Sequence, residues 1–229
     1  MDTPVFSYRP FFAIIGDIIE SKKIQNRLQV QYDMTTKLNL INEKYAQCIS
    51  SKFMITLGDE FQGLLNSGEY ITEIVDTIER EMHPIGLRFG IGVGSITTNI
   101  NYDIPVGADG PAYYNARKMI EHLKKSRNKK MEIKSNIGIE VEDGLYLSEL
   151  INSIFSMSTL IKSRWTPRQR EIINAYIKCD EVQGPAAALL GINQSNVQKA
   201  IKISGFYEYQ RAYRSIARVL SAFKENCDV

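Results

Sequence analysis

The stretch Ile55-Thr56-Leu57-Gly58-Asp59-Glu60-Phe61-Gln62-Gly63-Leu64-Leu65 decides the fold of this chain. An apolar run that ends at Leu57 is followed by Gly-Asp-Glu and then at once by a second apolar run at 61–65. Two such runs with a very short polar connection predict two antiparallel strands joined by a tight turn. We therefore expect Asp59 and Glu60 at the tip of a β-hairpin.

An earlier apolar run, residues 11–19, carries another carboxylate near its end, Asp17. Its near-continuous apolar character predicts a strand that is covered on both faces. A sheet that contains both strands would bring Asp17 beside Asp59. Two carboxylates about 4–5 Å apart either bind a divalent cation, here Mg²⁺ or Mn²⁺, or need another group to neutralise them. We predict a metal site at this pair; the alternative is that Asp59 is only a turn residue, a common role for Asp after Gly.

The rest of the first 143 residues alternates between strand and helix patterns. Apolar runs predict strands at 87–94 and 137–141, and helical periodicity predicts helices at 26–45, 69–82 and about 111–125. The predicted apolar face of the first helix consists of Leu28, Tyr32, Leu38, Ile41 and Tyr45. The order strand, helix, strand, strand, helix, strand is that of a split βαβ unit. We expect an α+β, ferredoxin-like domain whose antiparallel-rich sheet has its helices on one face.

The strand at 87–94 has glycine at every second position, Gly90, Gly92 and Gly94. One face of this strand therefore has no side chains, so a helix or a ligand can approach its backbone closely. Helix packing is the favoured interpretation. Because the glycines lie within a strand and do not open a helix, they do not match a dinucleotide-binding motif.

Candidate phosphate-binding residues flank these elements. Lys22 and Lys23 form a basic loop after the first strand, and Asp109 precedes Pro111 as the predicted cap of the helix at 111–125. The N-terminus of that helix can receive a phosphate, and Lys118 lies on the same helix. We predict nucleotide or phosphate contacts at Lys22, Lys23, Asp109 and Lys118; the alternative for the basic residues is a solvated surface.

Four pieces of the chain resemble the SatD family of bacterial proteins, and the resemblance covers most of the sequence. The pieces are Ile14-Ile15-Gly16-Asp17-Ile18, Thr56-Leu57-Gly58-Asp59-Glu60-Phe61-Gln62-Gly63-Leu64, Phe89-Gly90-Ile91-Gly92-Val93-Gly94 and Gly107-Ala108-Asp109-Gly110-Pro111-Ala112-Tyr113. The same pieces are more distantly similar to the class III nucleotidyl cyclase domain, which has a palm-like fold. In that fold an aspartate after the first strand and one in the following hairpin hold two metal ions. The resemblance implies these roles for Asp17 and Asp59.

The chain departs from the cyclase pattern on the helix after the glycine-rich strand. Cyclases carry an Asn there and an Arg four residues later, which orient the ribose and stabilise charge on the phosphate. The best alignment places Tyr114 and Lys118 at these positions. Asn115 and Arg117 are only two residues apart and point in different directions on a helix. We therefore do not expect cyclase activity.

The C-terminal part predicts a helix-turn-helix. Thr166 caps a helix that starts with Pro167, and two further helices flank a tight turn at Gly191. In such a unit the second helix, 194–202, lies in the major groove of DNA. The predicted DNA contacts are Arg168, Arg170, Gln194, Ser195, Asn196, Gln198, Lys199 and Lys202. The alternative is a protein-interaction or dimer module.

Composition agrees with a soluble globular protein: 44% of the residues are hydrophobic, 24% are charged, and the net charge is +2. The charge is uneven, because residues 160–229 contain 11 Lys and Arg against 6 Asp and Glu. Three scattered cysteines, without zinc-binding spacing, suit a reducing compartment. With no N-terminal signal pattern and no long apolar run, we expect a cytoplasmic protein.

Together these patterns predict a cyclase-like domain at 1–143, a linker helix at 144–164 and a helix-turn-helix domain at 165–229. The leading hypothesis is a homodimeric regulatory protein that binds duplex DNA and senses a nucleotide or a metal. One alternative is a Mg²⁺-dependent enzyme that acts on a nucleoside triphosphate. The other is a non-catalytic scaffold for a partner protein.

Overall fold

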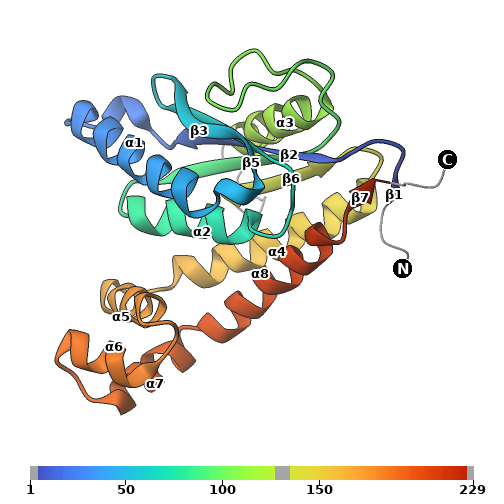
Figure 1. The fold of residues 1–229 in the computed structure, drawn as a ribbon. Coiled ribbons are helices and arrows are strands. Elements are labelled where there is room, and N and C mark those ends of the chain that lie inside the picture. The colour runs from blue at the N-terminus through green and yellow to red at the C-terminus, as the bar shows by residue number, and fades with distance from the viewer. Residues whose placement is uncertain (1–4, 127–134, 226–229) are drawn as a thin grey trace. The chain divides into compact units, whose positions relative to one another are not determined.

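A computed structural model of the chain describes residues 5–126 and 135–225, with a five-stranded mixed sheet at its centre (Figure 1). The strands are β2 (Phe11–Ile18), β3 (Ile49–Leu57), β4 (Glu60–Leu65), β5 (Leu87–Gly94) and β6 (Ile137–Val141). They are arranged in the order β3-β4-β2-β5-β6. Only β5 and β6 pair in parallel; the other three pairs are antiparallel. The predicted α+β class and the five predicted strands are confirmed.

The hairpin predicted around Gly58 joins β3 to β4. Leu57 pairs with Glu60. The turn between them consists of Gly58, whose φ is 57°, and Asp59. Glu60 is thus the buried first residue of β4. The prediction that placed it at the tip is wrong, because the turn needs only two residues. The backbone N–H of Ile18 donates to the carbonyl oxygen of Asp59 at 3.1 Å, so the end of β2 lies beside the hairpin as predicted.

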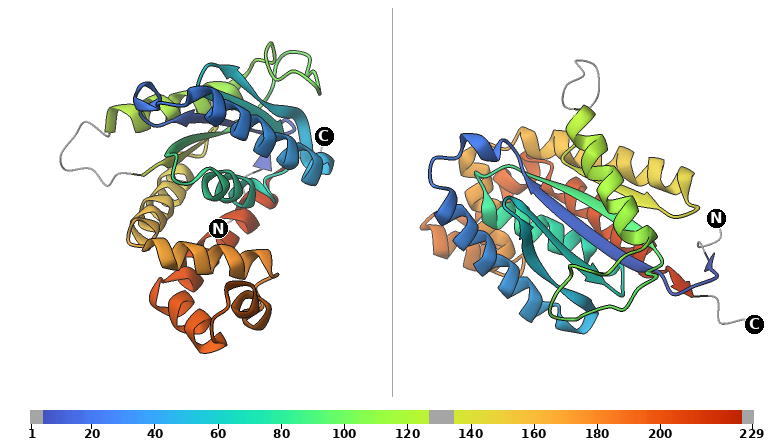
Figure 2. Two further views of the ribbon diagram at one scale, coloured as in Figure 1. Left: turned by 90° about the vertical axis from the view of Figure 1, so that its left-hand side faces the viewer. Right: turned by 90° about the horizontal axis from the view of Figure 1, so that it is seen from above.

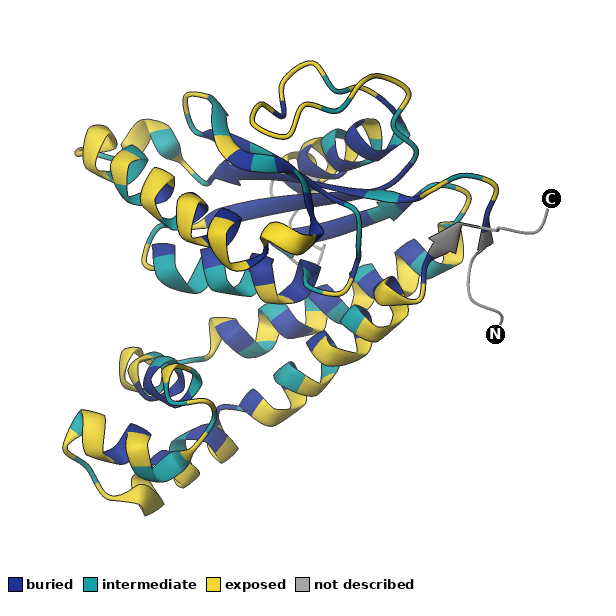
Figure 3. Ribbon diagram, in the orientation of Figure 1, coloured by how far each residue is buried: buried dark blue, intermediate teal, exposed yellow. Residues whose placement is uncertain are grey.

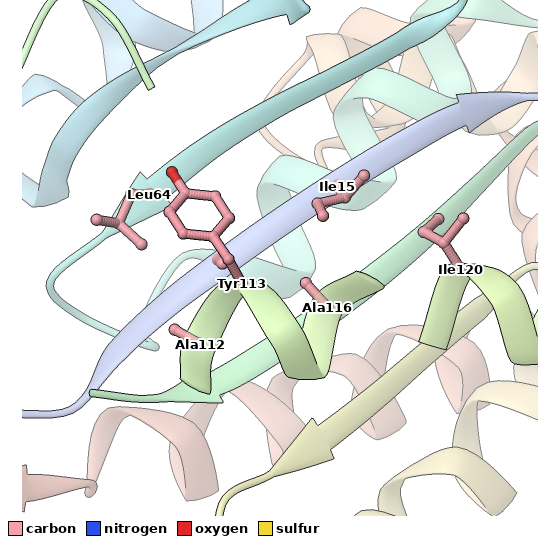
Figure 4. Packing of buried hydrophobic residues seen from close by; sticks show 7 residues of the cluster. Ile15, Leu64, Ala112, Tyr113, Ala116 and Ile120 are labelled. Carbon is pink, nitrogen blue, oxygen red and sulfur yellow. The ribbon is translucent and has the colours of Figure 1, made fainter. Parts of the chain in front are cut away.

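Helix α3 (Pro111–Ser126) lies directly on the glycines of β5. A Cβ atom at Gly90 would be 2.2 Å from the carbonyl oxygen of Ala116, and one at Gly92 would be 1.9 Å from that of Ala112. Ordinary contacts are 3.4–4 Å, so only glycine allows the helix to approach this closely. The packing role predicted for these glycines is confirmed. The buried layer between α3 and the sheet is formed by residues of both, namely Ala13, Ile15, Leu64, Ala112, Tyr113, Ala116 and Ile120 (Figure 4).

Helices cover both faces of the sheet, with α3 on one and α2 (Ile71–Met82) on the other (Figures 1 and 2). The prediction of helices on one face is therefore wrong. The physical reason is that β2 and β5 are apolar on both faces: seven of the eight residues of β2 and all eight of β5 are buried. Helix α2 buries Ile71, Ile74, Val75 and Ile78, as its periodicity predicted.

Helix α1 (Arg27–Lys44) packs against β3 with only part of the apolar face predicted for it. Leu38 and Ile41 are buried, but Leu28 and Tyr32 are 82% and 69% exposed. From Tyr32 to Leu38 the chain advances six residues, roughly one and two-thirds helical turns. The first two residues therefore lie on a different side of the helix from the rest, so the prediction of one continuous face is wrong.

An asparagine side chain closes each edge of the sheet. On β3, the amide of Asn42 donates to the carbonyl of Phe53 at 2.9 Å and accepts from its N–H at 2.8 Å. On β6, Asn152 makes the same pair of bonds with Ile139, at 2.9 and 2.8 Å. Each asparagine thus satisfies both backbone groups of one edge residue, which would otherwise be unpaired.

The chain divides into two compact units. The first comprises residues 1–156 and 216–229, and the second comprises residues 157–215. Helices α4 (Leu145–Ser163) and α8 (Phe206–Ser221) each have residues in both units. The first unit also contains short 3₁₀ helices at Ser21–Lys23 and Ala46–Cys48 and a parallel pair of strands, β1 (Val5–Phe6) and β7 (Lys224–Glu225), which the sequence patterns did not predict. Within the described residues, every helix is too short or too polar to cross a membrane.

The second unit contains α5 (Pro167–Lys178), α6 (Gln183–Leu190) and α7 (Gln194–Ile203). Thr166 caps α5 as predicted: its hydroxyl accepts from the backbone N–H of Gln169, whose side chain accepts from the N–H of Thr166. The three helices contact one another and bury Ile173, Ala187, Val197 and Ile201. The second unit therefore has an apolar core of its own.

Candidate functional site

Asp17 is buried at the end of β2 and is bonded to two cations. Its Oδ2 accepts from Arg88 Nη1 at 2.7 Å, and its Oδ1 lies 3.0 Å from Lys124 Nζ. Arg88 is the cross-strand partner of Asp17 on β5 and is also buried. Lys124 comes from the last turns of α3 and is 45% exposed. Both oxygens of the carboxylate are thus neutralised by basic groups from two other elements.

Glu60 is the cross-strand partner of Asp17 on the other side, in β4. Its Oε2 accepts from the guanidinium of Arg117, which lies on α3 and is 42% exposed. The other oxygen, Oε1, is buried and has no hydrogen-bond partner among the described residues. A buried acceptor without a donor costs free energy, so this oxygen marks a site that a further donor would stabilise.

A network of five charged side chains therefore lies between α3 and one end of the sheet. It consists of Asp17, Glu60, Arg88, Arg117 and Lys124. Three cations against two carboxylates give it a net charge of +1 at neutral pH. The sequence interpretation missed Glu60 as a buried group and missed all three cations. The sequence could have predicted that Arg88 points toward α3, because Arg88 precedes Gly90 by two residues and so lies on the same face of the strand as the glycines.

The predicted metal pair is only partly assembled. Asp59 is half-buried in the turn beside β2, and its backbone carbonyl bonds to Ile18. Carboxylates are the ligands that Mg²⁺ and Mn²⁺ prefer, but both oxygens of Asp17 are held by Arg88 and Lys124. Among the described residues, no three His, Cys, Asp or Glu side chains are grouped closely enough to hold a metal ion. The residues as they lie do not fit a bound metal.

The predicted phosphate-binding residues do not form one site. Lys22 and Lys23 are exposed on the 3₁₀ helix after β2, and Lys23 pairs with Glu20 at 3.2 Å. Lys118 is exposed on α3 and lies 2.5 Å from Glu140 of β6. Asp109 does not cap α3; Gly110 immediately precedes the helix, and the Asp109 carboxylate accepts from the hydroxyl of Tyr114 at 2.5 Å.

Two tyrosine hydroxyl groups on α3 have raised pKa values. Tyr113 is buried under the helix, its hydroxyl has no partner in the described chain, and burial raises the pKa of that hydroxyl. The hydrogen bond to Asp109 raises the pKa of the Tyr114 hydroxyl. Both phenols are therefore neutral at physiological pH, and the Tyr114 hydroxyl donates a hydrogen bond to Asp109.

In the second unit, α7 places the predicted DNA-contacting side chains at the surface. Gln194, Ser195, Asn196, Gln198, Lys199 and Lys202 are all exposed. None of these six side chains bonds to another residue within the described ranges 5–126 and 135–225. Val197 and Ile201, on the side of α7 that faces the core of the second unit, are fully buried.

The two arginines predicted to reach phosphates differ in their surroundings. Arg168 is exposed on the first turn of α5 and pairs with Glu171 at 2.6 Å. Arg170 is half-buried: it donates to the carbonyl of Lys162 at 2.6 Å, and its guanidinium lies 5.6 Å from the ring centre of Trp165. Arg168 is therefore accessible to a ligand, whereas Arg170 already has a structural role.

Comparisons with solved structures find distant likenesses to nucleotidyl cyclases and to a regulator protein. The chain is similar to a bacterial light-regulated adenylyl cyclase at 12% identity and a TM-score of 0.41, over 57% of this chain and 74% of that chain. It is similar to the guanylate cyclase domain of RhGC from Catenaria anguillulae in complex with GTP at 14% identity and a TM-score of 0.38, over 62% and 82%. It is also similar to the Regulator of Polyketide Synthase Expression from Bifidobacterium adolescentis at 10% identity and a TM-score of 0.30, over 91% and 85%. These likenesses assign no function to this chain.

The sequence itself matches a family. A search of the curated proteins finds no match. The profile of the SatD family matches residues 11–220, a range that begins at the first strand of the central sheet and ends within α8. The match therefore covers elements of both units and nearly the whole described chain, and the chain belongs to the SatD family.

Proposed function

We propose that this protein binds duplex DNA through its second unit, with α7 in the major groove. The observation that carries the proposal is the outer face of α7: six polar side chains are exposed, and none has a partner in the described chain. Amide and hydroxyl side chains such as Gln194, Ser195 and Gln198 suit base edges, and Lys199 and Lys202 suit phosphates.

The connection between α6 and α7 supports this proposal. Three residues separate Leu190 from Gln194, and the first of them, Gly191, has a φ of 62°. A short turn of this kind allows two helices to cross closely, and the small Ala187 of α6 and Val197 of α7 are both buried. A helix-turn-helix places its second helix in the groove in this way.

The charge of the second unit also supports it. Between residues 157 and 215 the sequence has nine Lys and Arg against four Asp and Glu, a balance of +5. A basic surface supplies the sequence-independent part of DNA affinity by releasing counterions from the phosphates. Affinity should therefore fall steeply with salt.

The test is fluorescence anisotropy of a labelled 30-base-pair duplex titrated with the full chain at several salt concentrations. The double variant Lys199→Ala with Lys202→Ala should weaken binding and lower the slope of log affinity against log salt by about 2, since each phosphate contact contributes about 1. The control is Lys178→Ala, an exposed lysine at the end of α5, which should bind like the wild type. Absence of wild-type binding at low salt, or equal effects of both changes, would refute the proposal.

As a second candidate we propose that the first unit binds a nucleotide and so regulates the DNA-binding unit. Two half-exposed cations on α3, Arg117 and Lys124, favour it. Guanidinium and ammonium groups at a protein surface suit the phosphates of a nucleoside triphosphate. No catalytic step follows from this arrangement.

Isothermal titration with ATP and GTP tests the second candidate. Wild-type protein should bind one of them, and Arg117→Ala with Lys124→Ala should abolish the heat of binding. The control, Lys44→Ala, removes a lysine of the same unit whose partner is Glu73 on α2 and should leave binding unchanged. Repeating the titration with Mg²⁺ or Mn²⁺ shows whether nucleotide binding depends on a divalent cation. Wild-type protein that binds neither nucleotide would exclude this role.

A further inference from the structure

We propose that the second unit recognises adenine bases in the major groove of DNA through the side-chain amides of Gln194 and Gln198. These two residues of α7 are called the amide pair below. Because α7 must lie in the groove for this contact, the assignment rests on the proposed DNA binding. It adds the class of base that the protein selects.

The amide pair lies on the uncovered part of α7 (Figure 3). Gln194 and Gln198 are both exposed, and residues four apart are neighbours on the surface of a helix. The buried side of α7 is formed by Val197 and Ile201. Neither glutamine side chain bonds to another residue in the part of the chain that the structure describes. Both amides are therefore accessible to a ligand.

Amides and cations are separated along α7. The first five residues, 194–198, contain three amide side chains and no charged one, whereas Lys199 and Lys202 follow in the second half of the helix. In a helix-turn-helix, the N-terminal residues of the second helix contact base edges. The part of α7 that would reach the bases therefore carries amides, and its two lysines suit phosphates.

A side-chain amide matches the major-groove edge of adenine better than that of any other base. Adenine presents an acceptor, N7, beside a donor, the N6 amino group. The amide N–H of glutamine donates to N7, while its oxygen accepts from N6. Guanine presents two acceptors, so the amide oxygen would find no donor there, and cytosine and thymine each offer one polar group only. Adenine alone therefore engages both ends of the amide.

The spacing of the amide pair predicts the spacing of the adenines. Four residues of helix advance about 6 Å along the axis, and two base-pair steps advance about 7 Å along B-DNA. A helix that follows the groove would therefore place the two amides beside bases two steps apart. We expect a binding site with two A·T pairs separated by one further base pair.

Selection from a pool of 30-base-pair duplexes with a randomised centre tests this assignment. The full chain should enrich A·T pairs at the predicted spacing. In the selected duplex, 7-deazaadenine is then substituted for the two adenines, which removes the N7 acceptor and keeps the base pairing. Fluorescence anisotropy at fixed salt should show roughly tenfold weaker binding, since one lost bidentate contact has about this effect. The same substitution outside the selected site should leave affinity unchanged.

Two variants locate the contact on α7. Gln194→Ala with Gln198→Ala should bind the adenine and the 7-deazaadenine duplex equally well. The control, Asn196→Ala, removes an exposed amide two residues from either glutamine, which therefore points to a different side of the helix. This control should still discriminate between the two duplexes. Loss of discrimination in the control, or its survival in the double variant, would overturn the assignment to the amide pair.

The selection also separates this assignment from the proposed function. If the pool is bound without enrichment, or if guanine is enriched, adenine recognition is wrong and DNA binding stands. If no duplex is bound even at low salt, the proposed DNA binding is refuted and adenine recognition with it.

Discussion

The close approach of α3 to β5 makes a quantitative prediction for Gly90→Ala. The new Cβ would lie 2.2 Å from the carbonyl oxygen of Ala116, whereas ordinary contacts begin at 3.4 Å. The helix must therefore move outward by more than 1 Å at this point. Its neighbours Ala112 and Ile120 would lose part of their own contact with the sheet. Overpacking of this kind costs about 3 kcal/mol at the upper end of its usual range.

The neighbouring glycine, Gly138 on β6, is a matched control. It pairs directly with Gly90 across the parallel ladder. A Cβ at Gly138 would meet only the end of a flexible side chain closely, Met119 Cε at 2.5 Å, which can rotate away. Both changes reduce the conformational entropy of the unfolded chain equally, a stabilising effect of about 0.4–1 kcal/mol. The difference between the two variants therefore isolates the clash with the backbone of α3.

The assay is thermal unfolding followed by far-ultraviolet circular dichroism. A net loss of about 2–3 kcal/mol for Gly90→Ala corresponds to a decrease in Tm of about 4–12 °C for a chain of this size. Gly138→Ala should stay within about 3 °C of the wild type. If both variants unfold at the wild-type temperature, or if Gly138→Ala is the less stable one, the inferred backbone contact between α3 and β5 is wrong.

Three further predictions concern buried polar groups. Asp17→Asn should lower the free energy of unfolding by about 3 kcal/mol in urea titrations, since it leaves the buried Arg88 without its carboxylate. Lys124→Met, which changes a half-exposed partner of Asp17, should lower the free energy of unfolding by less than about 1 kcal/mol. Burial raises the pKa of the Cys48 thiol to about 11. In a chain whose other cysteines are replaced by serine, this thiol should therefore react slowly with an aromatic disulfide reagent at pH 8 and rapidly after unfolding. Fast reaction of the native protein would contradict the burial of Cys48. Because a raised pKa favours the folded state only below the unfolded value of about 9, the same chain should lose stability as the pH rises from about 9 to 11. Asn152→Ala should cost about 2–4 kcal/mol, since it leaves one buried N–H and one carbonyl of β6 unpaired, and wild-type stability in this variant would refute the contribution of the two bonds.

Local patterns were sufficient to predict the elements of the sheet. The hairpin at Gly58 could be recognised because apolar runs on both sides of a Gly-Asp pair leave few alternatives to a tight turn. The role of Gly90 and Gly92 could be recognised because a strand alternates its side chains, so glycine at every second residue leaves one face bare. In both cases the signal lies within about ten residues of sequence.

The charged network under α3 could not be predicted in the same way. Asp17 meets Arg88 across 71 residues of sequence, and Glu60 meets Arg117 across 57. Such pairs depend on the strand order and on the position of α3 along the sheet, which no periodicity in one segment contains. The prediction of Asp17 as a metal ligand considered its neighbouring carboxylate and had no information on the cations. The exposed Leu28 and Tyr32 were mistaken for core because the six-residue step from Tyr32 to Leu38 breaks the helical period, so Leu28 and Tyr32 do not share the buried face of α1.

The two asparagines at the rims of the sheet determine how this protein can associate with others. Phe53 and Ile139 are the middle residues of β3 and β6, and each gives both its backbone groups to a side chain of its own molecule. A strand from another chain could not form backbone hydrogen bonds with Phe53 or Ile139, so its hydrogen-bond ladder would be interrupted at the middle residue. Too few free backbone N–H and C=O groups remain on either side to hold that strand. Enlargement of the sheet by another chain, whether in an ordered complex or in a fibril, is thereby disfavoured at both ends. Partners are left with helices and loops as points of attachment.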